Sequence, residues 1–242
     1  MIAEKCRRKI LLAGALAALS GAALFARAPG YRLARARANL GSALLSEKGT
    51  FRILVNGRQM GKEQFEIKPE GVNWVAHGSS EVQTSEGTAR ISGTLKLHAD
   101  GTPAHYEWST EGNKKASASI NFDGLTATMD VHLEGAKPYT QALTFSASPI
   151  VVLDNNLYLH YAILARLYDR EKKGTQTFSV LVPQELTPGA ITVDSLGIEE
   201  VNGKKLEELT AKTQDLEVHL YLDNGRLIRI AAPSNGAEII RD

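Results

Sequence analysis

Cysteine is almost absent from this chain of 242 residues, and its single copy, Cys6, lies near the N-terminus. A disulfide framework is therefore excluded for the rest of the chain, which must be stabilised by its own packed core. Cys6 also precedes the first apolar run, so it is not placed as the lipid-bearing cysteine of a lipoprotein signal.

The sequence also lacks the motifs of several chemistries. It contains no G-x-S-x-G elbow, no glycine-rich phosphate loop, no H-E-x-x-H pair and no pair of cysteines. Templates for nucleophilic catalysis, nucleotide binding and zinc binding therefore find no support. His98, His132 and His219 fall on the solvent side of predicted strands, which is typical of surface histidines rather than metal ligands. We expect no metal site, no cofactor and no enzymatic activity.

Only the N-terminal part of the chain has an excess of positive charge. Residues 1–48 carry nine Lys and Arg residues against Glu4 and Glu47, whereas residues 49–242 carry 19 basic and 25 acidic residues. A mildly acidic domain does not attract nucleic acid, so we expect no nucleic-acid partner.

The N-terminus has the order of an export signal. A basic start precedes sixteen uncharged residues, 10–25, and Ala26-Arg27-Ala28 follows as a small-x-small cleavage pattern. Pro29 at the first mature position disfavours cleavage, and the apolar run is slightly short for a typical span of ~20 residues. Residues 1–28 are thus either a signal peptide or a single-pass membrane anchor, and 29–48 form a basic linker or short helix. We expect an exported, periplasmic protein, with residues 10–25 as the inner-membrane anchor if they are not removed.

Turn signals become regular after Thr50. Asn-Gly, Asp-Gly and Glu-Gly pairs recur every 11 to 16 residues, from Asn56-Gly57 to Glu134-Gly135. Such spacing predicts consecutive antiparallel strands. Between the turns, apolar and polar residues alternate, so each strand has one apolar side. The predicted strands are 50–55, 59–67, 72–83, 89–99, 103–110, 115–122, 125–133, 138–146, 176–183, 190–201, 213–223 and 226–232, with a further candidate at 237–241.

A one-sided sheet of this size must curl to cover its apolar face. The pattern therefore predicts a mainly β fold in residues 49–242, a single domain with about 11–12 strands in a strongly curved antiparallel meander. A half-barrel, a closed barrel and a sandwich remain open as alternatives.

One segment does not follow the strand pattern. Residues 154–173 are apolar at helical spacing, with Asp154 or Asn155 as the N-cap and Gly174 after the end. Because the helix is apolar over most of its circumference, it should be buried on the concave face of the sheet. A ligand held between helix and sheet would contact its polar-tipped and apolar side chains, Tyr158, His160, Tyr161, Leu164 and Tyr168. The alternative for His160 is a hydrogen-bonded core histidine.

Three segments carry a resemblance: "FRILVNGRQMGKEQFEI", "LDNNLYLHYAILARLYD" and "LYLDNGRLIRIAAPSNGAEIIRD". They resemble uncharacterised exported bacterial β proteins of the domain-of-unknown-function type. The overall plan is similar to the half-barrel lipoprotein carriers and chaperones of the bacterial envelope. That resemblance implies a curved sheet, covered by helices on its concave face, that shelters acyl chains; it transfers no functional residue.

Three functional hypotheses follow. The first is a non-enzymatic cell-envelope protein whose curved sheet binds a lipid-like ligand or a partner segment. The second is a membrane-tethered structural or assembly factor that binds an envelope protein through an exposed sheet edge. The least favoured is a hydrolase that uses His160 with Asp154 or Arg166. The sequence leaves the oligomeric state open.

Overall fold

The folded part of the chain consists almost entirely of β-strands that belong to one sheet. The computed structural model describes residues 44–85, 87–112, 115–201 and 203–242, so the predicted N-terminal hydrophobic helix lies outside the described residues. The strands are β1 (Glu47–Val55), β2 (Arg58–Glu70), β3 (Asn73–Thr84), β4 (Gly87–Leu97), β5 (Pro103–Glu111), β6 (Ala116–Asp123), β7 (Thr126–Leu133), β8 (Tyr139–Thr144), β9 (Ile150–Val152), β10 (Gln176–Val182), β11 (Thr187–Val201), β12 (Lys204–Lys212), β13 (Glu217–Asp223), β14 (Arg226–Ala232) and β15 (Ala237–Arg241).

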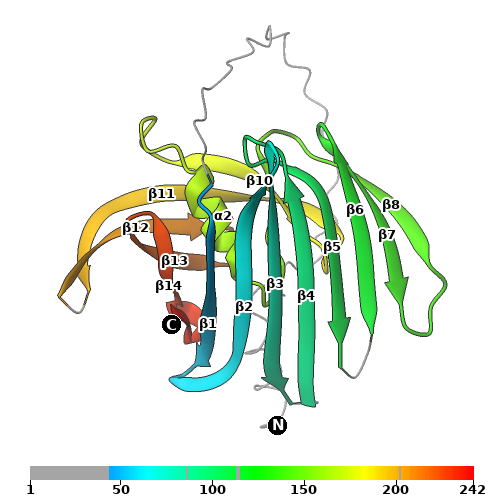
Figure 1. Cartoon of the computed structure of the whole chain (residues 1–242), viewed down its shortest axis with the longest axis horizontal. Coiled ribbons are helices and arrows are strands. Elements are labelled where there is room, and N and C mark those ends of the chain that lie inside the picture. Colours follow the sequence, from blue (N-terminus) through cyan, green and yellow to red (C-terminus); the bar gives the residue numbers. More distant parts are fainter. Residues whose placement is uncertain (1–43, 86, 113–114, 202) are drawn as a thin grey trace, which may run out of the picture.

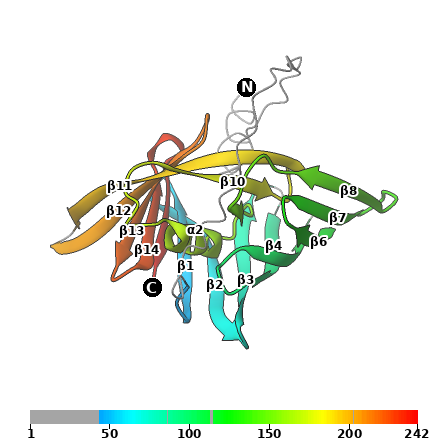
Figure 2. The same cartoon turned by 90° about the horizontal axis from the view of Figure 1, so that it is seen from above.

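Strands that follow each other in the chain are mostly neighbours in the sheet. The order is β8-β7-β6-β5-β4-β3-β2-β1-β15-β14-β13-β12-β11-β10-β9, and every pair is antiparallel except β9 with β10. Pairing of β1 with β15 joins the two halves of the chain into one surface. The edge strands β8 and β9 do not pair with each other, so the sheet is open, and it curves strongly (Figures 1 and 2). The predicted mainly β, curved antiparallel meander is thereby confirmed.

Alternation along the strands places the core on the concave side. In β1, Phe51 and Ile53 are buried, and in β2 the same holds for Phe65 and Ile67. The rings of Phe51 and Phe65 stack with their centroids 4.8 Å apart. These strands form one hydrophobic core with the opposite wall of the sheet and with the helix between them.

The helix α2 (Leu159–Leu167) lies between the two walls of the curved sheet (Figure 2). It has nine residues, and those from Leu159 to Ala165 are buried. The predicted range of 154–173 was therefore too long. Asn156 and Lys173 adopt positive φ angles of 66° and 49°, which a right-handed helix does not accommodate.

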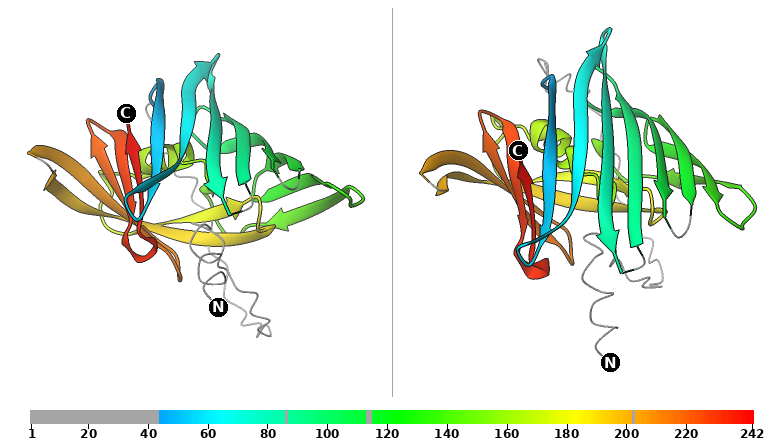
Figure 3. Two further views of the ribbon diagram at one scale, coloured as in Figure 1. Left: turned by 90° about the horizontal axis from the view of Figure 1, so that it is seen from below. Right: turned by 60° about the horizontal axis from the view of Figure 1, so that its bottom comes forward.

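Two strands were missing from the sequence-based prediction, β9 and β12. Strand β12 pairs with β11 to form a long hairpin that extends away from the rest of the molecule (Figure 3). Most of residues 203–208, at the start of β12, are charged. The local strand propensity is therefore low. Pairing on both edges, with β11 and β13, stabilises the strand instead.

Candidate functional site

The five residues predicted to line a ligand pocket all lie in the core around α2. Tyr158, His160, Tyr161, Leu164 and Tyr168 are buried, and their neighbours are other parts of the chain. The Tyr168 hydroxyl donates a hydrogen bond of 3.0 Å to the Gly174 carbonyl. The structure thus brings the five together as core, and their ligand-binding role stays a prediction.

The start of α2 is held by a carboxylate from a distant strand. Glu63 of β2 is fully buried and accepts hydrogen bonds from the main-chain N–H groups of Tyr158, at 2.6 Å, and Leu159, at 3.1 Å. These are two of the N–H groups that a helix leaves without partners at its N-terminus. Burial raises the pKa of Glu63 to about 8, although the two hydrogen bonds oppose the shift.

Sequence reasoning missed Glu63, and it assigned its capping role to Asp154 or Asn155. That assignment is wrong, because the N-cap position is Tyr158 and no side chain of the helix segment caps it. The signal for Glu63 was present in β2, where Glu63, Phe65 and Ile67 share the apolar side by strict alternation. An acidic residue at an inward position of a strand predicts a buried partner.

Asp154 belongs to a second set of buried hydrogen bonds beside the helix. It accepts one of 2.6 Å from the Tyr106 hydroxyl and one of 2.8 Å from the Gln184 amide. Burial raises the pKa of Asp154 to about 7, and these bonds oppose the shift. Asp154 in turn raises the pKa of Glu63 further, so the two carboxyls favour protonated forms near neutral pH.

His160 lies against this set without joining it. Its ring meets that of Tyr106 edge to face, with the centroids 5.3 Å apart. Burial lowers the pKa of the imidazole to about 3, although a polar contact with the Val152 main chain opposes the shift. The ring is therefore neutral at physiological pH. The hydrolase hypothesis required His160 to converge with Asp154 or Arg166. Asp154 is instead bonded to Tyr106, and Arg166 lies roughly 9 Å further along the helix axis.

A pair of glycines makes room for the N-terminal end of α2. Gly78 and Gly93 face each other across β3 and β4 on the concave side. A Cβ atom at Gly78 would collide with the Leu159 side chain, and one at Gly93 would lie 2.9 Å from Leu157 Cδ1 and also meet the Tyr106 hydroxyl. Glu63, the two glycines and Tyr106 therefore form a fitted seat for α2.

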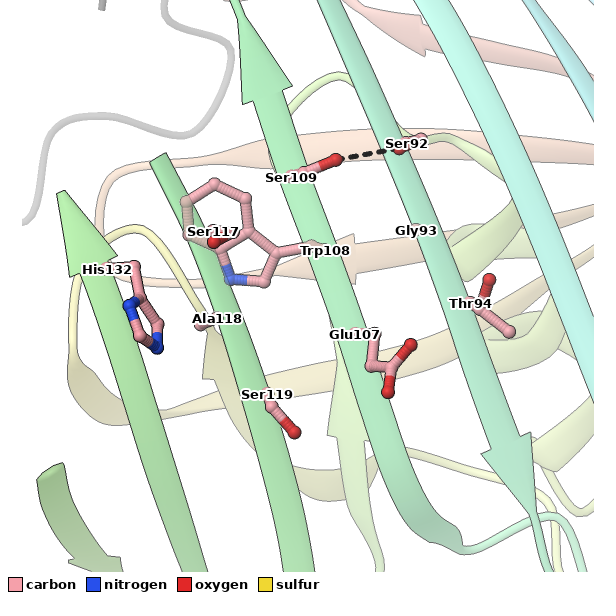
Figure 4. A pocket seen from close by; sticks show the side chains of 10 residues that line it. All are labelled: Ser92, Gly93, Thr94, Glu107, Trp108, Ser109, Ser117, Ala118, Ser119 and His132. Atoms are coloured by element: carbon pink, nitrogen blue, oxygen red, sulfur yellow. Dashed lines mark hydrogen bonds between the residues drawn. The ribbon is translucent and has the colours of Figure 1, made fainter. Parts of the chain in front are cut away.

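On the sheet itself, a shallow polar groove of about 320 Å³ crosses β4–β7 (Figure 4). Ser92, Ser109 and Ser117 occupy facing positions on three adjacent strands, and Ser92 and Ser109 share a hydrogen bond of 2.9 Å. Glu107 and His132 border the groove. The surface offers mainly hydroxyl groups, and the Glu107 carboxylate is paired with His105 at 3.0 Å.

A different hollow, of about 450 Å³, lies beside β11. Its lining comes from the chain that follows α2 and from the β11–β12 hairpin: Tyr168, Arg170, Lys173, Gly174, Ser195, Leu196, Gly197 and Glu207. Strand β10 pairs only with residues 187–193 of β11, whereas β11 continues to Val201. Over residues 194–201, the edge of β11 that faces away from β12 therefore has no strand partner among the described residues.

The most exposed large apolar side chains of any strand lie on this free edge. Leu196 is 56% exposed and Ile198 is 68% exposed. Leu196 is the extra residue of a β-bulge between Ser195 and Gly197, and bulges re-aim side chains at sheet edges. Side-chain oxygens accept from the N–H groups of Ser195, which donates to Asp194, and Gly197, which donates to Ser195.

The described part of the chain contains neither a cluster of metal-ligating side chains nor a helix suited to span a membrane. No three His, Cys, Asp or Glu side chains there are arranged to hold a metal ion. None of the helices in that same part combines the length and apolarity needed to cross a membrane.

Comparison with known proteins relates the chain to others by fold alone. No family model and no curated protein matches the sequence. Among solved structures, a β-barrel-like protein of the domain of unknown function DUF1849 from Brucella abortus matches with a TM-score of 0.55 and 10% identity, over 82% of this chain and 95% of that one. A DUF1089 family protein from Pseudomonas aeruginosa matches with a TM-score of 0.46 and 12% identity, over 71% and 89% of the two chains. The first match supports the barrel-like fold and the likeness to domain-of-unknown-function β proteins.

Proposed function

We propose that this protein is a non-enzymatic binding protein of the bacterial cell envelope, tethered by its N-terminal segment, that holds an extended segment of a partner protein along the free edge of β11. The observation that carries the proposal is the unpaired edge over residues 194–201, with Leu196 and Ile198 exposed next to a hollow of about 450 Å³. Large exposed apolar side chains on an open edge favour strand addition by another chain.

The packing around α2 favours this edge over the interior. A lipid-like ligand held between helix and sheet needs space beside Tyr161 and Leu164, and both side chains are buried against protein. The edge of β11 needs no rearrangement, because an incoming strand adds its main chain next to Ile198 and its apolar side chains over Leu196. Location in the envelope and the tether are supported by the basic, apolar and small-x-small order of residues 1–28.

The charge of the edge points to the kind of segment that binds. Glu199 and Glu200 follow Ile198 and are exposed. The neighbouring Glu208 raises the pKa of Glu199, and a positive charge nearby would relieve the repulsion between the two carboxylates. A segment that alternates apolar and basic residues fits this edge.

Peptide selection with the purified chain tests the proposal. Peptides chosen from a random display library should protect from hydrogen exchange those amides of residues 194–201 that point away from β12. Leu196→Asp with Ile198→Asp should lower their affinity at least tenfold, and the matched control Leu133→Asp, at another exposed leucine, should leave it unchanged. Peptides that bind without protecting these amides contradict the edge as the site. A native mass spectrum that shows co-purified lipid, lost after extraction, would favour the interior instead.

A further inference from the structure

The chain enters the folded domain at one defined end of the barrel-like body. Leu44 is buried there, and it lies with Leu167 of α2 against the β4–β5 turn, where a Cβ at Gly101 would be 2.7 Å from Leu167 Cδ2 and 3.9 Å from Leu44 Cγ. Leu45, the next residue, is partly exposed. The described chain therefore enters β1 at the end of the domain that is uppermost in Figure 1.

Exposed apolar side chains mark the turns at the same end. In an up-and-down meander alternate turns share an end, and the β2–β3, β4–β5 and β6–β7 turns lie together at the upper end (Figure 1). Val72, in the β2–β3 turn, is 83% exposed, and Leu125, in the β6–β7 turn, is 40% exposed. Hairpin turns usually carry small or polar residues, whereas two turns at this end of the domain each expose a large apolar side chain.

A hollow with surplus positive charge lies beside the start of β1 and the end of β15. It measures about 430 Å³ and is lined by Ser46, Glu47, Lys48, Glu66, Arg226 and Arg241. Both acids are already paired, Glu47 with Arg241 and Glu66 with Lys68. Within the described residues, no carboxylate lies within ion-pair distance of Lys48 or Arg226.

A further cation stands next to this hollow, on α2. The Arg166 guanidinium packs against the β13–β14 turn at Gly225, and its Nε and Nη2 atoms are buried without a hydrogen-bond partner among the described residues. Burial lowers the pKa of Arg166, attraction by Glu47 opposes this, and Arg170 and Arg226 repel the guanidinium. An anion in the hollow would relieve the repulsion between Arg226 and Arg166.

We propose that this end of the domain docks on a bilayer surface that contains anionic phospholipids. Val72, Leu125 and Leu45 enter the interface between headgroups and acyl chains, and Lys48 and Arg226 bind the phosphate of a headgroup in the hollow. Apolar insertion combined with basic residues is the usual chemistry of peripheral membrane contact. The inference rests on the proposed tether, which brings the end that carries Leu44 close to the bilayer.

Fluorescence quenching on the full chain in nanodiscs tests the docking. With Cys6→Ser as background, a single cysteine at Val72, Leu125 or Arg58 carries the fluorophore, and headgroup-labelled nitroxide lipid is the quencher. Arg58 begins β2 at the opposite end, and a strand of 13 residues spans roughly 40 Å. Labels at 72 and 125 should be quenched several-fold more than the label at 58.

Charge variants test the hollow. Lys48→Gln with Arg226→Gln should reduce the quenching at position 72 in discs of phosphatidylcholine mixed with phosphatidylglycerol, and should change it little in phosphatidylcholine alone. The matched control, Lys204→Gln with Lys205→Gln on the β11–β12 hairpin, should behave as wild type. Equal quenching at 72 and 58, in a chain that stays in the discs, would overturn the docking but leave the tether intact. A chain that does not enter the discs would overturn both.

Discussion

The buried carboxyl of Glu63 leads to a specific dependence of stability on pH. Its pKa is about 8 in the folded protein against 4.5 for a free glutamate, so the folded state holds a proton that the unfolded state has lost between these values. The contribution of Glu63 to stability is therefore fully present below pH 4.5 and is lost as the pH rises to about 8. The slope for one such group is about 1.4 kcal/mol per pH unit, and the whole difference corresponds to roughly 5 kcal/mol.

Asp154 also makes stability fall as the pH rises, but its contribution is lost at a lower pH than that of Glu63. Its pKa rises from 3.8 to about 7, so the contributions of both carboxyls are lost between about pH 4.5 and 7. Between pH 7 and 8, most of the remaining loss comes from Glu63.

The perturbation is Glu63→Gln, read by urea unfolding with tryptophan fluorescence from pH 5 to 9. Between pH 7 and 8 the variant should lose clearly less stability than wild type, in which Glu63 contributes a loss of about 1 kcal/mol. At pH 5 the variant should be less stable by about 1–3 kcal/mol, because the glutamine NH₂ group cannot accept the second helix N–H. Glu66→Gln, on the opposite side of β2, should leave the slope unchanged. A Glu63→Gln protein that keeps the wild-type slope from pH 7 to 8 would refute the reasoning.

Three further substitutions test the seat of α2. Tyr106→Phe should destabilise by about 1–3 kcal/mol in urea unfolding, since buried Asp154 loses one of its two hydrogen bonds; an unchanged midpoint contradicts that bond. Gly78→Ala should cost about 1–3 kcal/mol because its Cβ meets Leu159, and a neutral effect would show that the helix shifts freely. His160→Phe should leave the thermal midpoint equal or raised, because it removes two poorly satisfied buried nitrogens and keeps the ring contact; a large loss would show that His160 makes an essential hydrogen bond.

The sequence was sufficient for the class of fold because each strand carries its own evidence. Asn56-Gly57 and Asp123-Gly124 form hairpin turns as predicted, and Asn56, Gly57 and Gly124 have the positive φ angles that such turns need. Alternation then identified the buried side of each strand. Strand β9 has only three residues, all buried, and no alternation to reveal it.

The ends of α2 illustrate the limit of local patterns. Apolar spacing continued well beyond the true helix, because a buried turn and a buried helix present the same composition. The helix stops where Arg170 donates to the carbonyls of Ala165 and Tyr168, and it starts where Glu63 accepts from the main chain. Both contacts depend on residues outside the helix, and the one from Glu63 comes from a strand 95 positions earlier in the chain.

The helix also explains why function is better placed at the edges and ends of this sheet than in its interior. Its N-terminus is fixed by Glu63, and its C-terminal side by Arg170, which binds Glu207 of β12 with two hydrogen bonds of 2.7 and 2.9 Å. The chain from Tyr168 to Gly174 that ends the helix also lines the hollow beside β11. A segment bound at Leu196 and Ile198 would thus rest on the same residues that lock the helix in place. The interior then acts as a rigid support for that edge, because moving α2 would break its bonds to both walls of the sheet.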